Sequence, residues 1–600
     1  MAIPYQKKSF DHKREGSRGH FGHGRQPRPP QEDKQSKLPV PPALNNIRII
    51  TLAGVEEIGR NMTVLEHNDD IFVFDAGFSS KDETTPGVDY ILPNTKYLEE
   101  RAQNIRAVFA MHSHTDHIGA LPFIMPMFGK VPVFARLITA VLIKKQQETF
   151  PKLQGLDIRV IEKNQSVTIG RHTVHFFAVS SHLPDGMGVR IETESGDIVH
   201  TGILRLHHEN GTILPDTEAE FKTFENNKVL CLMADSTNTE KPGFATTEKE
   251  VMQNIDAIME NAKGRLIFGA FPAQITRLLH IIDKAVSLNK KIVTEGRSMK
   301  RNIEIVEQLS MHKHDTSHFI RPEDMHLYAP SEIVILATGP EGDEYVELER
   351  AADGLHRHII ITEGDTVVLS SSTISGYERN IQKLKDILSR EGARIIHYTT
   401  SDINASSHAH RDEVAYMIRK IAPQYMIPVS GCHYMLTVLG ELARTLGISE
   451  SRIVIPQNGS VIDMTPDGSS IRMLREKAPN TKVLVDGMSV SDVQEVVIKD
   501  RQALANDGMF VIVSVLDTAR GQLRKSPDII SRGFVYLKES QELLRESREI
   551  IKKTIETRAL KDGATLDVDD LKQEVVESIS KYLLQKTQKR PVVIPVILTL

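Results

Sequence analysis

Short apolar runs recur along most of the chain, and the spacing between them changes from region to region. From Ile47 the runs at 47–52, 61–65 and 71–77 are separated by turn residues, which predicts strands joined by hairpins. Helical patterns follow at 95–103 and 137–149. This mixture of elements indicates α/β layers.

A different pattern occupies residues 240–400. A helical pattern at 248–261 is followed by a strand at 265–269 and a second helix at 275–288. Strands that alternate with helices of this length predict parallel βαβ packing. The region therefore reads as a second α/β unit.

From Val483 the chain reads as a third, compact unit, preceded by a polar connection up to residue 482. Strands are predicted near 483–485, 496–499 and 509–515, and long helices at 539–558 and 569–588. The chain ends in an apolar, β-rich segment at 590–598. Such a strand should be buried in a sheet or at a subunit contact.

The first 46 residues differ from the rest because they are polar, basic and without apolar periodicity, which predicts a disordered tail. Residues 1–45 carry a net charge of +5, whereas the remainder carries –10. A nucleic-acid partner would therefore have to meet local basic patches, because the body as a whole repels phosphate.

Length and composition narrow the class of protein further. A chain of 600 residues is too long for one core, so we expect three or four domains. No apolar run approaches the ~20 residues that span a bilayer, and the N-terminus lacks a secretory signal, so no membrane association is expected. The two cysteines, Cys231 and Cys432, form no paired motif, which fits a reducing, cytoplasmic setting.

The strongest chemical signal is the stretch from His112 to His117, which has the pattern H-x-H-x-D-H and directly follows an apolar strand at 107–111. Imidazoles and a carboxylate together suit zinc or manganese. A polar loop rich in histidine by chance is the plain alternative, but three histidines and one aspartate rarely cluster in this way. A further candidate ligand, His182, follows the strand at 174–179.

Taken together, these motifs resemble the ribonuclease J family, which has a metallo-β-lactamase fold with a β-CASP insertion. The similarity covers nearly everything from Ile47 to Leu600. It rests on five segments, which are 57–62 (EIGRNM), 112–120 (HSHTDHIGA), 235–238 (DSTN), 296–299 (GRSM) and 528–535 (DIISRGFV).

The resemblance implies an αββα sandwich with an inserted β-CASP α/β domain and a small α+β C-terminal domain. The implied segments are a tail at 1–46, the first sandwich part at 47–240, the β-CASP domain at 241–400, the second sandwich part at 401–470, a linker at 471–482 and the C-terminal domain at 483–600. It also implies metal-dependent hydrolysis of RNA from a 5′-monophosphate end, with some internal cleavage, by a cytoplasmic dimer or tetramer.

Residue by residue, the resemblance assigns His112, His114 and His182 to one metal and Asp116 and His117 to another. Asp235 matches a proton donor, and His408 matches a proton acceptor. The segment that grips substrate phosphate corresponds to Asn404, Ala405, Ser406, Ser407 and His408. The pocket near the 5′ end corresponds to Ser370, Ser371 and Ser372.

Two family ligands are absent from this chain. Ile203 stands where the family has an aspartate that bridges both metals, and Ser430 stands where it has a histidine. A three-histidine set with an open position is a sound zinc site, so we expect one tightly bound Zn²⁺, or Mn²⁺, and a weak second site. Losing half of a two-metal clamp removes several kcal/mol of transition-state stabilisation, on the order of 10³-fold or more in rate.

Two functions remain open from the sequence. The first is a ribonuclease with reduced activity. The alternative is a catalytically weakened paralogue that binds RNA and pairs with an active ribonuclease J, as a hetero-oligomer. Ile203 and Ser430 favour the alternative, whereas Asp235, His408 and the three-histidine set favour the enzyme. A third and weaker idea, hydrolysis of a small metabolite by the same fold, is disfavoured because the β-CASP-like unit and the C-terminal domain indicate a long polymeric substrate.

Overall fold

The computed structural model describes most of the chain from residue 39 onward. The described ranges are 39–80, 85–151, 153, 155–179, 185–270, 274–308, 313, 315–337, 346–371, 378–486, 489–491, 495–535, 540–562 and 566–600. The predicted tail up to residue 38, the candidate ligand His182 and Ser372 lie outside these ranges.

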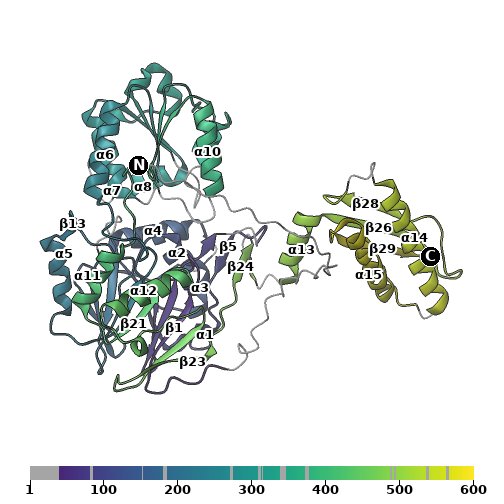
Figure 1. Ribbon diagram of the computed structural model, residues 1–600, viewed down its shortest axis with the longest axis horizontal. Helices are drawn as coiled ribbons and strands as arrows, with labels where there is room; N and C mark the ends of the chain where they lie inside the picture. Colours follow the sequence, from purple (N-terminus) through teal and green to yellow (C-terminus); the bar gives the residue numbers. More distant parts are fainter. Residues whose placement is uncertain are drawn as a thin grey trace, which may run out of the picture.

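Two stacked sheets form the first unit, drawn in the lower left of Figure 1. The strands of the larger sheet are, in spatial order, β23 Ile471–Lys477, β22 Ser460–Met464, β1 Ile47–Ala53, β2 Met62–His67, β3 Asp70–Phe74, β6 Ile105–Ala110, β7 Val133–Ala135 and β8 Ile158–Val160. Those of the smaller sheet are β21 Tyr425–Val429, β15 Val229–Asp235, β12 Asp197–His200, β11 Met187–Ile191, β10 His172–Ala178 and β9 Ser166–Ile169.

Three hydrophobic clusters show how the layers are ordered. One joins the inner faces of the two sheets, for example Phe109 of β6 with Phe176 of β10. The other two cover the outer faces with helices. The helices on the larger sheet are α1 Lys96–Glu99, α2 Thr115–Ile118, α3 Leu121–Phe128 and α4 Leu137–Glu148, and those on the smaller sheet are α5 Pro215–Glu220, α11 Arg411–Ile421 and α12 His433–Thr445. The order is helix, sheet, sheet, helix, as the family resemblance implied.

Strand β1 lies inside the larger sheet and pairs on one side with β22, which comes from the far end of this unit. The buried Arg48 binds Asp463 across this pairing, with 2.7 Å between Nε and Oδ1, although the two residues are 415 positions apart. The first unit is therefore built from two segments of the chain, before and after the second unit.

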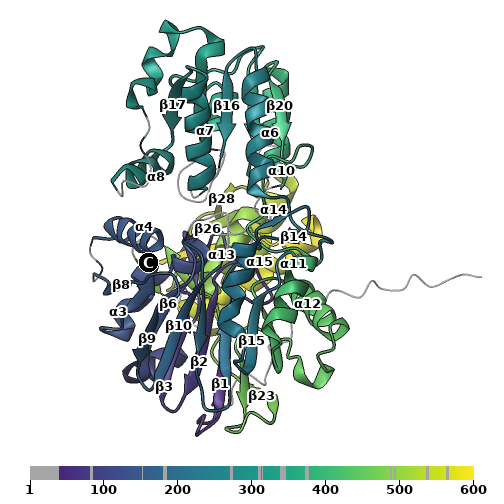
Figure 2. The same ribbon diagram turned by 90° about the vertical axis from the view of Figure 1, so that its left-hand side faces the viewer.

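The second unit is a five-stranded parallel sheet with helices on both faces, drawn at the top of Figure 2. Its strands are, in spatial order, β17 Lys291–Glu295, β18 Ile333–Ala337, β16 Leu266–Gly269, β19 Thr366–Leu369 and β20 Arg394–His397. One face is covered by α6 Glu248–Asn261, α7 Ile275–Ser287 and α8 Arg297–Gln308, and the other by α9 Val346–Ala352 and α10 Glu378–Arg390. Ile138 of α4 packs against Ile275 and Val306, which joins the first two units.

The third unit packs two long helices against one face of a small sheet. Its central strand is β26 Met509–Asp517, which pairs in parallel with β29 Val592–Thr599 and antiparallel with β27 Gln522–Leu523 and β28 Asp528–Arg532. The helices are α14 Gln541–Asp562 and α15 Val568–Thr587. The apolar C-terminal segment is thus a sheet strand, as predicted.

Three local predictions were wrong. Residues 496–499 lie in a helix, α13 Glu495–Asp507, although their β-branched run resembles a strand. Residues 471–477, predicted as linker, form the edge strand β23, whose polar side chains are largely exposed. Residues 39–46, predicted as tail, reach the folded part, because Arg48 donates to the Pro41 carbonyl and Ala43 is buried.

The boundary of the third unit also differs from the prediction. Residues 483–486 form β24 Val483–Asp486, which pairs with β5 Tyr90–Leu92 of the first unit. These strands belong to a small sheet with β4 Ser79–Ser80 and β25 Ser489–Ser491. A separate hairpin consists of β13 His208–Glu209 and β14 Thr212–Ile213. Within the described ranges, no helix is long and apolar enough to cross a membrane.

Candidate active site

The histidine motif lies where the larger sheet ends. Strand β6 pairs in parallel with β3 and β7, and the motif begins in the turn after β6 and continues into α2, which contains Asp116 and His117. The carboxyl ends of parallel strands open onto one edge of the sheet, so side chains from neighbouring strands can meet there. His112 and His117 are buried at this edge.

Asp75, at the end of β3, fixes the orientation of His117. Its Oδ2 lies 2.7 Å from His117 Nδ1, and its Oδ1 accepts from the Met111 N–H at 2.8 Å. A carboxylate on one ring nitrogen turns the other, Nε2, toward the site. The sequence interpretation did not assign Asp75 a role, and its only signal was a charge at the end of an otherwise apolar strand.

The charges around His117 outweigh its burial. Burial alone would lower its pKa, but Asp116, Asp75 and Asp235 together raise the pKa of His117 to about 9. His114 shows the opposite behaviour, because burial lowers its pKa to about 4 despite the nearby Asp116. The motif therefore combines one imidazole that holds its proton with another that is neutral at pH 7.

Asn61 occupies the space between the last two motif residues. Its Nδ2 donates to the Asp116 carbonyl at 3.1 Å and to the Asp116 carboxylate at 3.3 Å, and lies 3.3 Å from His117 Nε2. Gly77 allows this close packing, since a Cβ there would lie 1.6 Å from the Asp116 carbonyl oxygen. Asn61 belongs to the EIGRNM segment that carries the family resemblance, but nothing in the local sequence predicts this contact.

His112 and His114 face each other more loosely. Their ring centroids are 4.3 Å apart and their planes are nearly perpendicular, at 81°. Neutral imidazoles are the form that binds metal ions, and the low pKa of His114 favours that form. The third ligand expected for this pair, His182, lies outside the described residues.

The candidate catalytic residues Asp235 and His408 are in direct contact, although 173 positions separate them. Asp235 ends β15 and is buried, and its Oδ2 lies 2.5 Å from His408 Nδ1. Thr237 donates to Oδ1 of Asp235 through its N–H and its hydroxyl. Burial opposes ionisation of Asp235, but His408 and Thr237 more than compensate and lower its pKa.

This pair belongs to the same site as the histidine motif. The charge of Asp235 contributes to the raised pKa of His117, and His408 contributes to the lowered pKa of His114. Electrostatic effects of this kind need short separations. The structure thus brings four motif residues and two residues from distant segments to one edge of the sandwich.

The two substituted positions have different surroundings. Ile203 is buried, with 2% of its surface exposed, in the loop after β12. Ser430 follows β21 with a φ of 53°, and its carbonyl accepts from the Ser236 hydroxyl at 2.7 Å. His208 and His433, which lie near these positions in the sequence, bind the Ala245 carbonyl and Glu56 instead. Neither therefore replaces a missing ligand.

The two halves of the motif differ in how well they fit a metal ion. Over the ranges that the structure describes, no group of three or more His, Cys, Asp or Glu side chains is placed to hold one. His112 and His114 supply two imidazoles that suit zinc and would need His182 as a third. Among the described residues no further ligand joins Asp116 and His117, and the Asn61 amide donates hydrogen atoms to Asp116 rather than offering a lone pair. This second pair is a poor fit for a metal ion.

The predicted phosphate-binding segment is held by specific hydrogen bonds. The hydroxyl of Ser406 accepts from Asn238 Nδ2 at 2.6 Å and from the His408 N–H at 3.1 Å. The Asn404 side-chain oxygen accepts from Arg277 at 2.8 Å. Ala405 is buried, whereas Ser407 is partly exposed.

Ser370 and Ser371, at the end of β19, are both fully buried. In this conformation their side chains are not presented to solvent. The third residue of that predicted pocket, Ser372, lies outside the described residues. Its proposed role near the 5′ end stays a prediction, as do the roles of the other candidate residues.

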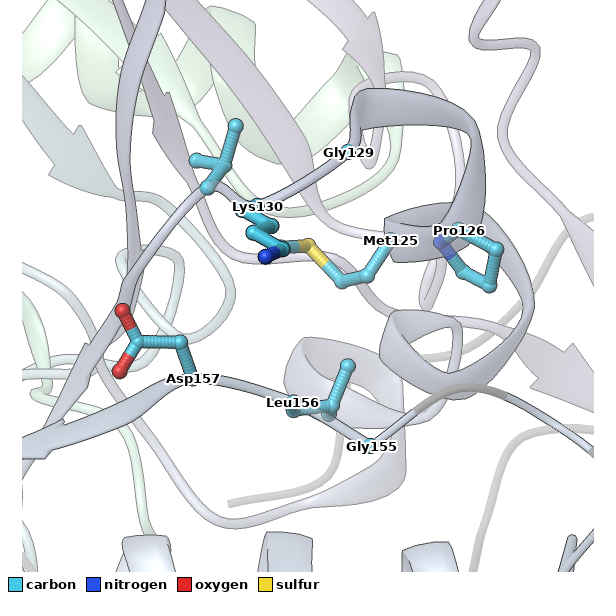
Figure 3. Close-up of a pocket in the computed structure, with 8 residues that line it drawn as sticks. Met125, Pro126, Gly129, Lys130, Gly155, Leu156 and Asp157 are labelled. Atoms are coloured by element: carbon cyan, nitrogen blue, oxygen red, sulfur yellow. The ribbon is translucent and has the colours of Figure 1, made fainter.

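A cavity of about 300 Å³ lies away from this site, between the end of α3 and the segment before β8 (Figure 3). It is lined by Met125, Pro126, Gly129, Lys130, Val131, Gly155, Leu156 and Asp157. None of these is a candidate ligand or catalytic residue, so the cavity is not part of the site.

Models of four protein families match separate segments of the chain. Residues 71–223 match the beta-lactamase superfamily domain, 263–388 the beta-CASP domain of ribonuclease J, 396–456 the RNA specificity domain of Zn-dependent metallo-hydrolases, and 496–600 the ribonuclease J C-terminal domain.

Whole-chain relatives agree with these matches. Ribonuclease J2 of Bacillus subtilis is 32% identical over 553 residues, which is 92% of this chain and 98% of the relative. Ribonuclease J 1 of Streptococcus pyogenes is 32% identical over 555 residues, with the same coverage. A solved structure of a protein of unknown function from Enterococcus faecalis shares the fold, with a TM-score of 0.50 and 17% identity over 70% of this chain and 100% of that one.

Proposed function

Because the chain belongs to the ribonuclease J family, we propose that it is a metal-dependent ribonuclease that removes nucleotides from the 5′ end of RNA and also cuts internally. The observation that carries this proposal is the contact between Asp235 and His408 beside the histidine motif. Two residues so far apart in the sequence meet at this edge in an arrangement suited to proton transfer.

The Asp235–His408 pair would move one proton. With the proton on His408 Nδ1, the buried Asp235 accepts this hydrogen bond and holds the ring so that Nε2 carries a lone pair. Nε2 can then accept a proton from the attacking water. His408 is then an imidazolium, and Nε2 can pass the proton taken from water to the leaving oxygen of the cleaved phosphodiester. The proton-donor role that the family resemblance assigns to Asp235 stays a prediction.

The site would bind zinc as its cofactor. We propose one tightly held ion on His112, His114 and His182, with Mn²⁺ as a substitute, and a weak second site at Asp116 and His117. Such an ion would supply Lewis-acid polarisation of the scissile phosphate. Three imidazoles are a common ligand set for zinc, which supports the tightly held ion. Asp116 and His117 supply only two ligands, which supports a weak second site.

We further propose that RNA with a 5′-monophosphate is the preferred substrate. Residues 404–408 reach the catalytic pair at His408, and the Asn404 amide and the Ser407 hydroxyl are donors of the kind that binds a phosphate group. Ser370 and Ser371 would have to become accessible in order to contribute.

The experiment uses purified protein, measurement of bound zinc and manganese, and decay of a 5′-monophosphorylated RNA beside the same RNA with a 5′-hydroxyl. A His112→Ala/His114→Ala protein serves as the control. We expect wild type to degrade the monophosphorylated RNA faster than it degrades the 5′-hydroxyl RNA. We also expect it to degrade the monophosphorylated RNA faster than the control protein does. Equal decay by wild type and control would contradict an enzymatic function.

A second candidate function is a regulatory subunit that binds RNA and pairs with an active ribonuclease J. Ile203 and Ser430 favour it, because they remove both ligands that would complete the second metal site. Mixing the protein with an active ribonuclease J tests this alternative. Formation of a stable mixed complex with altered cleavage, without activity of the protein alone, would support it.

For assembly, we propose a homodimer or homotetramer through the third unit. The face of its sheet opposite α14 and α15 carries apolar side chains in register. The partly exposed Val511 lies beside the exposed Ile530 and Ile594, and the exposed Val596 and Leu598 follow further along β29. Light scattering on wild type and a Val596→Glu/Leu598→Glu variant tests this, with smaller assemblies expected for the variant. The free cysteines fit a cytoplasmic location.

A further inference from the structure

Arg277 is a charged side chain buried inside the second unit. It lies on α7, beside α6 (Figure 2), with 1% of its surface exposed. A buried guanidinium is tolerated only when its donors are paired. Its contacts therefore show which groups it holds.

All of its described partners come from different elements. Arg277 binds the Glu248 carboxylate at 2.7 Å, the Gln274 side-chain oxygen at 2.6 Å and the Ser370 carbonyl at 2.9 Å. It also binds the Asn404 side-chain oxygen at 2.8 Å. The planar fork of arginine suits several acceptors in fixed directions, which a lysine cannot reproduce.

Two of these partners mark the places where the chain crosses between the first and second units. Glu248 is the first residue of α6, directly after the chain leaves the first unit. Asn404 lies four residues before His408, in the segment where the chain returns to the first unit. The Arg277 guanidinium therefore connects both crossing segments, through Glu248 and Asn404, to the Ser370 carbonyl at the end of β19.

The contact also orients Asn404. Its side-chain oxygen accepts from Arg277 at 2.8 Å and from Gln274 at 3.3 Å. With the oxygen occupied, the side chain offers its NH₂ group, a hydrogen-bond donor that suits a phosphate oxygen. Four residues later the same segment supplies His408.

We propose that Arg277 is a positioning residue for RNA binding. It holds Asn404 so that the Asn404 amide donates to an RNA phosphate, and it keeps residues 404–408 in place beside Asp235. This inference rests on the proposed function and adds to it a residue that does not itself touch the substrate.

The same sheet offers a matched control. Arg265 forms a comparable ion pair with Asp365, with 2.6 Å between Nη2 and Oδ2, and both side chains are mostly buried. This pair lies where β16 and β19 begin, whereas Ser370 lies where β19 ends. The other partners of Arg265 are the Ile360 carbonyl and Thr362. Replacing Arg265 therefore disturbs the same domain without touching Asn404.

The test compares Arg277→Gln with Arg265→Gln in the full-length protein. Binding of a 5′-monophosphorylated RNA is measured in EDTA, and hydrogen exchange is measured over residues 402–408. We expect Arg277→Gln to weaken binding at least tenfold and to accelerate exchange there, whereas Arg265→Gln changes neither. Equal effects of the two variants, or wild-type binding and exchange in Arg277→Gln, overturn the proposal.

A double-mutant cycle covers the case in which Arg277→Gln does not fold. Arg277→Lys, Asn404→Ala and their combination are compared for RNA affinity. If Arg277 acts through Asn404, the double variant binds about as weakly as Asn404→Ala alone. If the losses of RNA affinity in the two single variants multiply in the double variant, the two residues act independently and the proposal is overturned.

These readouts also separate the proposal from the proposed function. If wild type binds RNA without cleaving it, the enzymatic function fails, but affinity and exchange still decide the role of Arg277. If wild type binds no RNA, both the proposed function and the phosphate contact fail. Where an active protein is obtained, a positioning role predicts a larger change in KM than in kcat.

Discussion

The two halves of the histidine motif are built in different ways. Asp116 and His117 are fixed by protein groups, since Asp75 and Asn61 bind them directly. His112 and His114 face each other across 4.3 Å, and the third residue expected to join them is His182. One continuous motif can therefore contain two kinds of half. In one half hydrogen bonds keep the side chains in place, and the other half is suited to be kept in place by a bound metal ion.

The largest expected effect comes from removing the first half. His112→Ala/His114→Ala should abolish tight zinc binding and lower RNA cleavage by about 10³-fold, because Lewis-acid stabilisation worth several kcal/mol is lost. Metal analysis and a cleavage assay measure both. The control, Asp116→Asn, should leave the tight zinc in place. A loss of that zinc in Asp116→Asn would show that the halves are not separate.

Rebuilding the second half should have the next largest effect. Ile203→Asp/Ser430→His restores the two ligand types that the family resemblance places there, so a second equivalent of zinc and a roughly tenfold or greater rise in cleavage are expected. Ile203→Asp alone, measured without metal, should destabilise the protein because it buries a charge. If the double variant binds no additional zinc, positions other than 203 and 430 limit the second half.

Asp75→Asn tests the hydrogen bonds that hold the second half. Breaking a buried charge pair by changing one partner typically lowers the free energy of unfolding by about 3 kcal/mol. We expect a loss of this size in urea unfolding and a lower pKa of His117 by NMR titration. The zinc content of the first half should stay the same. Unchanged stability would mean that Asp75 does not support His117.

The pH dependence of stability should separate the halves in metal-free protein. The folded pKa of His117, about 9, exceeds that of an unfolded histidine, so its contribution is full below about pH 6.5 and disappears as the pH rises to 9. The folded pKa of His114, about 4, is lower, so stability falls as the pH drops from about 6.5 to 4.

Each histidine changes the slope by at most about 1.4 kcal/mol per pH unit. His117→Gln should flatten the alkaline side of the profile and His114→Gln the acidic side, measured by urea unfolding in EDTA. The reverse assignment would contradict the opposite pKa shifts of the two residues.

Much of the fold followed from periodicity, because regular alternation of buried strands and amphipathic helices is a local property. Helix α6 was predicted at its observed limits, 248–261. Residues 496–499 were wrongly predicted as a strand because β-branched residues also occur in helices. Strand β23 was wrongly predicted as a linker because an edge strand buries too little surface to show an apolar pattern.

The site was predictable only where its chemistry is local. The motif at 112–117 is visible in the sequence, whereas Asp75, Asn61 and Arg277 act through contacts with distant residues. A single carboxylate, amide or guanidinium at a strand or helix end carries no signal of its partner. Such residues become evident only when the chain is folded.

The pairing of β1 with β22 has a consequence for synthesis. The ribosome produces Arg48 early, but Asp463 emerges 415 residues later, which at ordinary elongation rates is roughly 20–80 s. The edge of β1 must wait for its neighbour throughout that time, while the entire second unit is made and is free to fold. The second unit is therefore complete before the first, although synthesis of the first unit begins earlier.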